Sequence, residues 1–194
     1  MAAEVGTRQL PTRGYNPISQ AQVLAPMHKG VAGIHNFNQL LQAALNRYAQ
    51  NPIPGQPGSF HRGDKVIQLS NNYDKNLFNG DVGFVTFTDP EIGQFQAEFN
   101  GETQEFEKTE ANDMALAYAI SIHKSQGSEY PVVILPIMKQ HFMMLQRNLL
   151  YTGITRGKKE VFIVCQPEAY AMAVKNSKSQ IRSTHLKEKI LAPR

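Results

Sequence analysis

The chain has 194 residues, a formal net charge of +4, 41% hydrophobic residues and no Trp. This length suits one domain or a domain with a small insertion, and the apolar content excludes a disordered or fibrous protein. No apolar run approaches the roughly 18 residues of a membrane-spanning helix, and the N-terminus does not resemble a secretory signal. We therefore expect a soluble, cytoplasmic protein without a membrane partner. The single Cys165 and the scattered histidines exclude a disulfide framework and predict no metal site.

The first part of the chain predicts a lead-in, a strand and a helix. Residues 1–21 contain Pro11, Gly14 and Pro17 with little periodicity, which is typical of an extended segment. A short apolar strand over residues 22–25 follows, and then a helix whose apolar residues recur at helical spacing. Those residues are Ile34, Phe37, Leu41 and Leu45. A Pro- and Gly-rich stretch over residues 52–58 then indicates a linker.

The hydrophobic pattern changes from period 3.6 to period 2 in the middle of the chain. Phe95, Ala97 and Phe99 alternate with polar residues. Asn79-Gly80 and Asn100-Gly101 provide the positive backbone angles that tight hairpins require. Residues 60–113 are therefore expected to form a small antiparallel barrel.

After this module the chain returns to alternating strands and helices. Residues 119–123, 132–136 and 161–165 are expected to be buried strands, and residues 143–156 and 168–178 helices. This alternation predicts an α/β fold, a parallel sheet with flanking helices, that a β module interrupts. The expected domains are a lead-in (1–21), the α/β domain (22–59 and 114–194) and the barrel (60–113).

Charge separates the two modules. Residues 60–113 contain four basic and eleven acidic side chains, a net charge of about −7, which leaves about +11 for the rest of the chain. The α/β part is therefore the better candidate for contact with phosphate groups.

The stretch from Ala119 to Glu129 is the most informative one, because a buried strand runs into a polar loop there. Loops at the carboxyl ends of parallel strands are common ligand sites. Side chains that can hydrogen-bond a phosphate backbone are Ser121, His123, Lys124, Ser125 and Ser128. Gly127 allows close approach of the main chain, and Glu129 can accept from a hydroxyl or a metal-bound water. The alternative is a solvated turn between strands.

A second stretch, from Asn148 to Lys159, ends a predicted helix just before a strand. Arg156 lies at that helix end, where a planar cation could reach a phosphate held by another domain. The alternative is that Arg156 only favours the helix dipole.

Taken together, these stretches resemble motifs V and VI of superfamily one helicases of the RecD type. The matching sequences are His-Lys-Ser-Gln-Gly-Ser-Glu after a strand and Tyr-Thr-x-x-Thr-Arg at a helix end. The segment from Gln22 to Gly30 resembles the motif IV region of the family. The segment from Gly63 to Asp81 resembles the start of its inserted 2B barrel.

The resemblance implies a RecA-like P-loop NTPase motor domain, called 2A, with an inserted SH3-like barrel, 2B. It implies that Arg156 reaches the γ-phosphate across an interdomain cleft, with Gly127 and Glu129 close to the nucleotide. The residues that would face single-stranded DNA are Ser121, His123, Lys124 and Ser125. Tyr151 is expected either in the core or lining a cleft.

Three further residues have an ordinary alternative beside the functional one. Lys29 resembles the motif IV cation that senses the γ-phosphate, and it is otherwise a solvated loop lysine. Asn72 and Lys75 lie in a polar, aromatic and basic loop of the barrel that could contact DNA. The alternative for that loop is a structural hairpin connection.

Two sequence features of a complete motor are absent. There is no Gly-x-x-x-x-Gly-Lys-Ser/Thr phosphate loop and no apolar strand ending in Asp-Glu for magnesium. ATP and Mg²⁺ are therefore expected to be held mainly by an N-terminal motor domain. The chain is expected to be a C-terminal fragment that is inactive alone.

The function that the resemblance implies is that of an ATP-dependent DNA helicase, a hydrolase, acting in DNA recombination and repair. It would translocate 5′ to 3′ on single-stranded DNA, and other subunits of a recombination nuclease complex are possible partners. The name exodeoxyribonuclease V alpha subunit could attach to it without nuclease chemistry, because no carboxylate cluster suggests a two-metal site. The alternative is a non-motor module that binds nucleic acid or protein.

Overall fold

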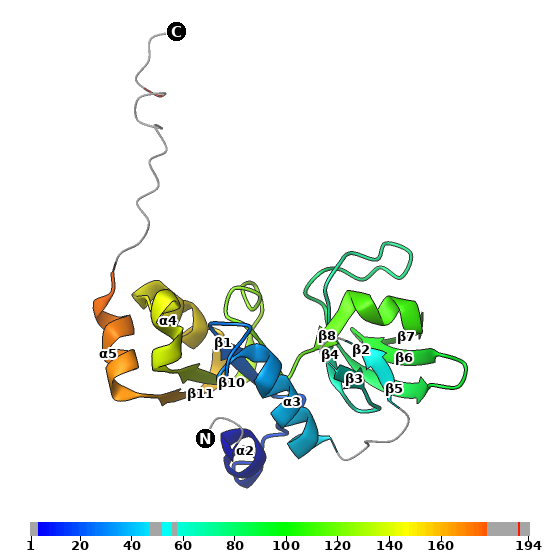
Figure 1. The fold of residues 1–194 in the computed structure, drawn as a ribbon, viewed down its shortest axis with the longest axis horizontal. Coiled ribbons are helices and arrows are strands. Elements are labelled where there is room, and N and C mark those ends of the chain that lie inside the picture. The colour runs from blue at the N-terminus through cyan, green and yellow to red at the C-terminus, as the bar shows by residue number, and fades with distance from the viewer. Residues whose placement is uncertain (1–3, 47–51, 56–57, 178–189, 191–194) are drawn as a thin grey trace.

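The computed structural model describes residues 4–46, 52–55, 58–177 and 190 (Figure 1). Its first module is a parallel sheet with strand order β11-β10-β1-β9. The strands are β1 (Ala21–Ala25), β9 (Ala119–Ser121), β10 (Tyr130–Ile137) and β11 (Gly157–Cys165). All neighbouring strands in this sheet pair in parallel, so the expected α/β fold is confirmed.

Helices cover both faces of this sheet. Successive side chains of a strand point to opposite faces, and here the apolar side chains on each face pack against helices. Val23 belongs to the hydrophobic cluster that contains residues of α3 (Ile34–Leu45). Leu24 belongs to a second cluster, with residues of α4 (Arg147–Ile154) and α5 (Pro167–Lys175). The predicted helix with Phe37 and Leu41 on its apolar face is confirmed, and both side chains are buried.

The expected extended lead-in is wrong, because two short helical segments precede β1. They are η1 (Val5–Gln9) and α2 (Leu10–Thr12). Leu10 is fully buried, so these turns gain apolar contact with the core. Pro11 is compatible with them because it occupies the first turn of α2, where its missing N–H costs no hydrogen bond.

The expected helix over residues 143–156 is confirmed only over Arg147–Ile154, which form α4, because the helix is interrupted before Arg147. A 3-10 helix, η3 (Lys139–Met144), comes first and α4 begins at Arg147. Asn176, just after α5, provides hydrogen-bond partners for the main chain at this interruption. Its side-chain amide donates to the Leu145 carbonyl at 2.8 Å, and its carbonyl accepts from Arg147 N at 2.9 Å. A contact from a distant part of the chain thus replaces the helical hydrogen bonds.

The second module, called the β module here (residues 52–55 and 58–116), contains a five-stranded antiparallel sheet of order β7-β6-β5-β4-β8. Its strands are β4 (Lys65–Gln68), β5 (Val82–Asp89), β6 (Gln94–Phe99), β7 (Glu102–Glu107) and β8 (Met114–Leu116). A hairpin of β2 (Ile53–Gly55) and β3 (Gly58–Phe60) precedes them, and η2 (Lys108–Asp113) lies before β8. Asn100 and Gly101, with φ of 52° and 86°, make the predicted tight turn between β6 and β7.

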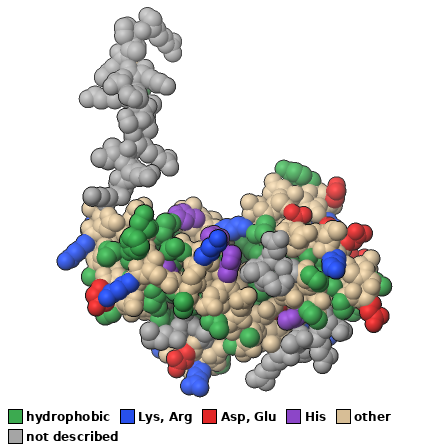
Figure 2. Space-filling model, in the orientation of Figure 1, with side chains coloured by type: hydrophobic (Ala, Val, Ile, Leu, Met, Phe, Trp, Pro, Cys, Tyr) green, Lys and Arg blue, Asp and Glu red, His purple; other side chains and the backbone are tan. Residues whose placement is uncertain are grey.

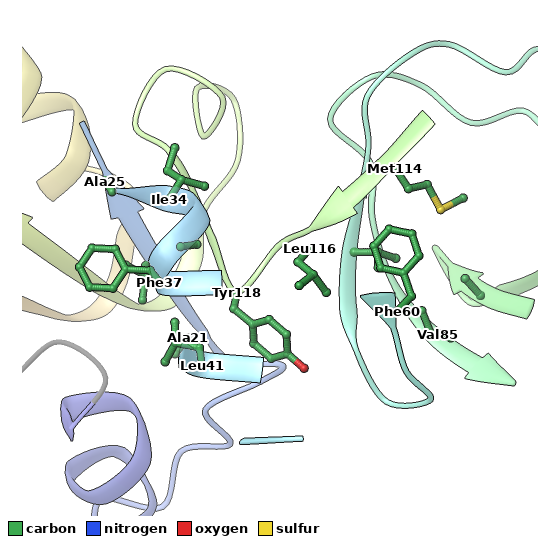
Figure 3. Packing of buried hydrophobic residues seen from close by; sticks show 14 of the residues in the cluster. Ala21, Ala25, Ile34, Phe37, Leu41, Phe60, Val85, Met114, Leu116 and Tyr118 are labelled. Carbon is green, nitrogen blue, oxygen red and sulfur yellow. The ribbon is translucent and has the colours of Figure 1, made fainter. Parts of the chain in front are cut away.

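One hydrophobic cluster continues from the parallel sheet into the β module (Figure 3). Phe37 and Leu41 of α3 lie on one side, and Phe60 and Leu116 of the β module lie on the other. Tyr118, in the segment between β8 and β9, is 3% exposed and lies between the two groups. The two modules therefore share a core.

Candidate nucleotide and DNA interface

Residues 122–129, called the crossover here, link the carboxyl end of β9 to the amino end of β10. Ser121 pairs with Ala25 at the end of β1, whereas Val132 pairs with Ala21 at its beginning. The crossover therefore descends the whole height of the sheet. We expected the entire loop at the carboxyl edge, but only its first half lies there.

The first half of the crossover is a hydrogen-bonded turn that begins at Ser121. The Ser121 hydroxyl accepts from the Lys124 N–H at 3.1 Å, and the Ser121 carbonyl accepts from the Ser125 N–H at 3.2 Å. His123 is exposed, and Lys124 is half-buried. Partial burial lowers the pKa of Lys124 from its ordinary value. His123 and Lys124 can thus offer an imidazole and a cation at the carboxyl edge.

The expected contact of Ser125 with DNA is wrong for its side chain. Ser125 is fully buried, and its hydroxyl donates to the Ile122 carbonyl at 2.7 Å. A serine here closes the turn, since its short side chain satisfies a main-chain acceptor inside the protein.

Arg156 lies at the opposite, amino edge of the sheet. Its carbonyl accepts from Tyr130 N, at the start of β10, at 2.8 Å. Its guanidinium donates to the Ser128 carbonyl at 3.2 Å and the Thr152 carbonyl at 3.3 Å. A third N–H donates to the Thr155 hydroxyl at 3.2 Å.

These contacts position the charge of Arg156 without neutralising it. A guanidinium has five N–H groups, so two remain after the three bonds that Arg156 makes to described residues. Among the residues that the structure describes, no carboxylate lies within ion-pair distance of Arg156. The arrangement fits a cation held ready for an anion from outside the chain.

Gly127 and Glu129 lie in the second half of the crossover, next to the Ser128 carbonyl that holds Arg156. Gly127 has φ of +86°, and a Cβ at this position would meet no atom of the described residues within 4 Å. The conformation needs glycine, and the main chain there is open to a ligand. Glu129 is half-exposed and pairs with Lys158 at 3.0 Å, so its charge already has a partner.

The structure does not bring Lys29 to Arg156. Lys29 is exposed in the loop that follows the carboxyl end of β1. That loop packs on η3, because His141 Nε2 and the Ala32 carbonyl are 3.0 Å apart. Arg156 lies at the other end of β10, whose eight residues span roughly 23 Å. Lys29 therefore shares an edge of the sheet with His123 and Lys124 and not with Arg156, which argues against the expectation that both cations sense one phosphate.

Asn72 and Lys75 tie the loop after β4 to η2. The Lys75 ammonium pairs with Glu110 at 2.6 Å and lies 4.2 Å from the centroid of the Phe106 ring. The Asn72 side chain accepts from Lys75 N and donates to Glu110. Burial by itself raises the pKa of Glu110, but hydrogen bonds from Lys75 and from the Glu107 backbone outweigh it and lower the pKa. These contacts support the structural-hairpin alternative for both residues.

Charge differs between the two modules on the molecular surface. Figure 2 shows most acidic side chains over the β module, and Lys, Arg and His side chains near the boundary between the modules. Tyr151 of α4 is 69% exposed and lines a shallow surface hollow, so the cleft-lining alternative holds for it.

The sequence interpretation missed a group of amides. Gln126 of the crossover and Gln146 and Asn148 at the start of α4 line a groove together with His123. Amides on a helix surface are ordinary in sequence, so only their convergence in three dimensions distinguishes them.

The donor set at the amino edge fits a phosphate group better than a metal ion. Arg156 and the main chain at Gly127 present N–H groups and open space. Within the described ranges, no group of three or more His, Cys, Asp or Glu could hold a metal. Nor is any helix in those ranges both long and apolar enough to cross a bilayer.

Two family models match the chain. The UvrD-like helicase C-terminal domain matches residues 116–164, and the ATP-dependent RecD-like DNA helicase SH3 domain matches residues 37–99. The first match covers the crossover and Arg156. The second covers most of α3 and much of the β module.

Relatives with curated descriptions align with most of the chain. It is 34% identical over 171 residues to the ATP-dependent RecD2 DNA helicase of Deinococcus radiodurans, which is 88% of this chain and 23% of that protein. It is 27% identical to the RecBCD enzyme subunit RecD of Mycolicibacterium smegmatis, over 89% of this chain and 30% of that subunit. The chain thus spans less than a third of the length of either relative.

Solved structures share the fold. The crystal structure of Pif1 helicase from Bacteroides in complex with ADP-AlF3 and ssDNA has a TM-score of 0.60 and 18% identity. That match covers 84% of this chain and 44% of the other. The structure of Bacteroides Pif1 bound to ssDNA has a TM-score of 0.53 and 17% identity, over 74% and 40%. The parallel sheet with its flanking helices thus resembles the RecA-like domain 2A of these helicases. Over most of its length the chain is similar to RecD-type helicases, and it combines matches to a UvrD-like helicase C-terminal domain and to a RecD-like SH3 domain.

Proposed function

We propose that the chain supplies the second motor domain and the SH3-like barrel of an ATP-dependent DNA helicase that moves 5′ to 3′ on single-stranded DNA in recombination and repair. A first motor domain would hold ATP and Mg²⁺, and further subunits of a recombination complex are proposed partners. The observation that carries the proposal is the crossover. One short segment runs from His123 and Lys124 at one edge of the sheet to Ser128, the residue that holds Arg156 at the other.

At the amino edge, the two N–H groups of Arg156 that remain free would bind oxygens of the γ-phosphate. A cation placed there stabilises the charge that develops during phosphoryl transfer, an effect of about 10³ to 10⁵ in rate. Gly127 would let the main chain approach the nucleotide, since no atom blocks the position of its missing Cβ. Glu129, held by Lys158, would accept a hydrogen bond from the ribose or from a metal-bound water.

At the carboxyl edge, His123, Lys124 and Lys29 would contact the DNA backbone. Their cationic and hydrogen-bonding groups suit phosphate oxygens, which account for most of the affinity of such contacts. Because the crossover is short and hydrogen-bonded, a movement at Ser128 on nucleotide binding would be transmitted to Lys124. Coupling of this kind is what a translocating motor requires.

The proposal is tested by ATPase activity after mixing the chain with a separately expressed first motor domain of a RecD-type helicase. We expect no hydrolysis by the chain alone and DNA-stimulated hydrolysis by the mixture. Arg156→Ala should lower the rate of the mixture about 10³-fold. DNA affinity without nucleotide should stay unchanged, because Arg156 lies at the other edge of the sheet.

Arg8→Ala is the matched control, since Arg8 is an exposed cation far from the crossover in sequence and forms an ion pair with Glu4, at 3.9 Å. It should leave the rate unchanged. Hydrolysis by the chain alone, or an active mixture that is indifferent to Arg156→Ala, would contradict the proposal. DNA binding by the chain with no ATPase in any mixture would favour the alternative, a non-motor binding module.

A further inference from the structure

A groove of about 200 Å³ opens between the crossover and α4, on the side of the carboxyl edge. Its floor is apolar and consists of Ile122, Met144 and Leu149. Ile122 and Leu149 are buried parts of the core, so the floor is held firmly by the fold.

The rim of this groove is polar and uncharged. It is formed by His123 and Gln126 of the crossover and by Gln146 and Asn148 at the start of α4. No hydrogen bond joins any of these four side chains to another residue of the described part of the chain. Gln146 is the N-cap residue of α4, yet its side chain makes no capping bond. Thr152, also on the rim, uses its hydroxyl on the Asn148 carbonyl at 2.8 Å.

The chemistry of this lining selects one class of ligand. A phosphate or a metal ion needs charged or anionic partners, which the rim lacks. Amides and an imidazole offer donors and acceptors side by side, and these match the edge of a nucleobase. An apolar floor suits the flat face of the same ring.

The position of the groove agrees with this ligand. His123 is on its rim, and the next residue, Lys124, offers a cation for the adjoining phosphate. We propose that the groove receives one nucleobase turned out of the single strand while Lys124 binds the backbone beside it. This inference rests on the proposed function, because it requires DNA to run along the carboxyl edge.

The test compares single strands that are identical except for one abasic position, moved stepwise along the oligonucleotide. The affinity of the chain is measured for each strand, as wild type and as the double variant Gln146→Ala/Asn148→Ala. We expect the variant to bind the intact strand about tenfold more weakly, the loss of roughly one base contact. When the abasic site is at one particular position, the affinity of the wild type should fall by the same factor. The affinity of the variant should not fall further.

Controls separate this inference from the proposal on which it rests. Gln9→Ala removes an exposed amide of η1, a segment whose Val5 packs in the cluster with α3 and not in the cluster with α4, and the variant should bind like the wild type. Lys124→Glu should weaken binding to intact and abasic strands alike; if it has no effect, the DNA face itself is wrong. Suppose that Lys124→Glu weakens DNA binding but the groove variant binds DNA normally, or loses the same affinity on every abasic strand. The base site would then be wrong, while the DNA-binding face would be supported.

Discussion

Lys65 places a positive charge inside the protein, at the contact between the β module and the parallel sheet. It is 3% exposed, and burial lowers its pKa from 10.5 to about 8. Its ammonium donates to the Ala21 carbonyl of β1 at 3.1 Å and lies 5.7 Å from the centroid of the Tyr130 ring. In the described part of the chain it has no carboxylate partner, so at neutral pH the charge is held there at a cost in stability.

The lowered pKa of Lys65 has a defined consequence for stability. Between pH 8 and 10.5 the unfolded chain binds a proton that the folded chain has released, so the free energy of unfolding should rise with pH across this window. Lys65→Met should remove the contribution of Lys65 to that rise and increase the stability at pH 7 by about 1 to 3 kcal/mol. Urea unfolding at pH 7, 9 and 10 measures both effects.

Lys108→Met is the control, because Lys108 is an exposed lysine of the same module. It should leave the pH dependence as in the wild type. A Lys65→Met variant that is less stable than the wild type at pH 7 would show that the bond to Ala21 outweighs the cost of burying the charge.

At the scale of elements, Asp64 joins α3, the β2-β3 hairpin and the segment between β8 and β9. Its carboxylate accepts from Gln42 Nε2 and Asn46 Nδ2, both at 2.6 Å. It also accepts from His61 N at 2.7 Å and from the Tyr118 hydroxyl at 2.8 Å. Burial first, and then the Asp64 charge, raise the pKa of Tyr118 far above its ordinary value, so Tyr118 stays a donor.

Asp64→Asn should therefore destabilise the chain by about 2 to 4 kcal/mol, because an amide NH₂ would face donors where a carboxylate oxygen now accepts. Asp74→Asn, a change at an exposed position of the same module, should cost less than about 0.5 kcal/mol. Urea unfolding of the two variants gives the comparison. Equal stabilities would mean that the buried carboxylate does not fix the position of α3.

The sequence predicted elements where one local pattern decided them. The apolar spacing of Phe37 and Leu41 gave α3, and Asn100-Gly101 gave the turn between β6 and β7. The prediction from sequence failed where a contact between distant parts of the chain determines the local structure. The N-terminal segment is helical because Leu10 packs in the core. The predicted helix is interrupted before Arg147 because Asn176 hydrogen-bonds the main chain there.

The sequence named the residues of the proposed site but could not predict how they are arranged. The motifs identified Arg156 and Lys124, but the register of β9 and β10 decides that they lie at opposite edges. Ser125 has the residue type of a phosphate ligand, and only its burial shows that it closes a turn. The amides of α3 and of the groove look alike in sequence, although Asn46 is buried against Asp64 and Gln146 lines an open groove.

At the scale of the whole molecule, the inserted β module is not an independent body. One hydrophobic cluster holds Leu41 of α3 together with Phe60 and Leu116 of the β module. Hydrogen bonds cross the same boundary, since Asn38 of α3 donates to the Leu116 carbonyl of β8 at 3.0 Å and Lys65 of β4 donates to the Ala21 carbonyl of β1 at 3.1 Å. In the proposed motor the barrel would therefore move together with the parallel sheet as one body.

This coupling predicts a single unfolding transition for both modules. In calorimetry the measured enthalpy should equal the van't Hoff enthalpy, the mark of a two-state change. Leu116→Ala, a change at a position only 1% exposed, should lower the midpoint of the whole transition, at a cost of about 2 to 4 kcal/mol. Ile92→Ala, at a site 65% exposed, should leave it in place. Two separated transitions, with Leu116→Ala shifting only one, would show that the barrel unfolds by itself and that the shared cluster does not bind the modules into one cooperative unit.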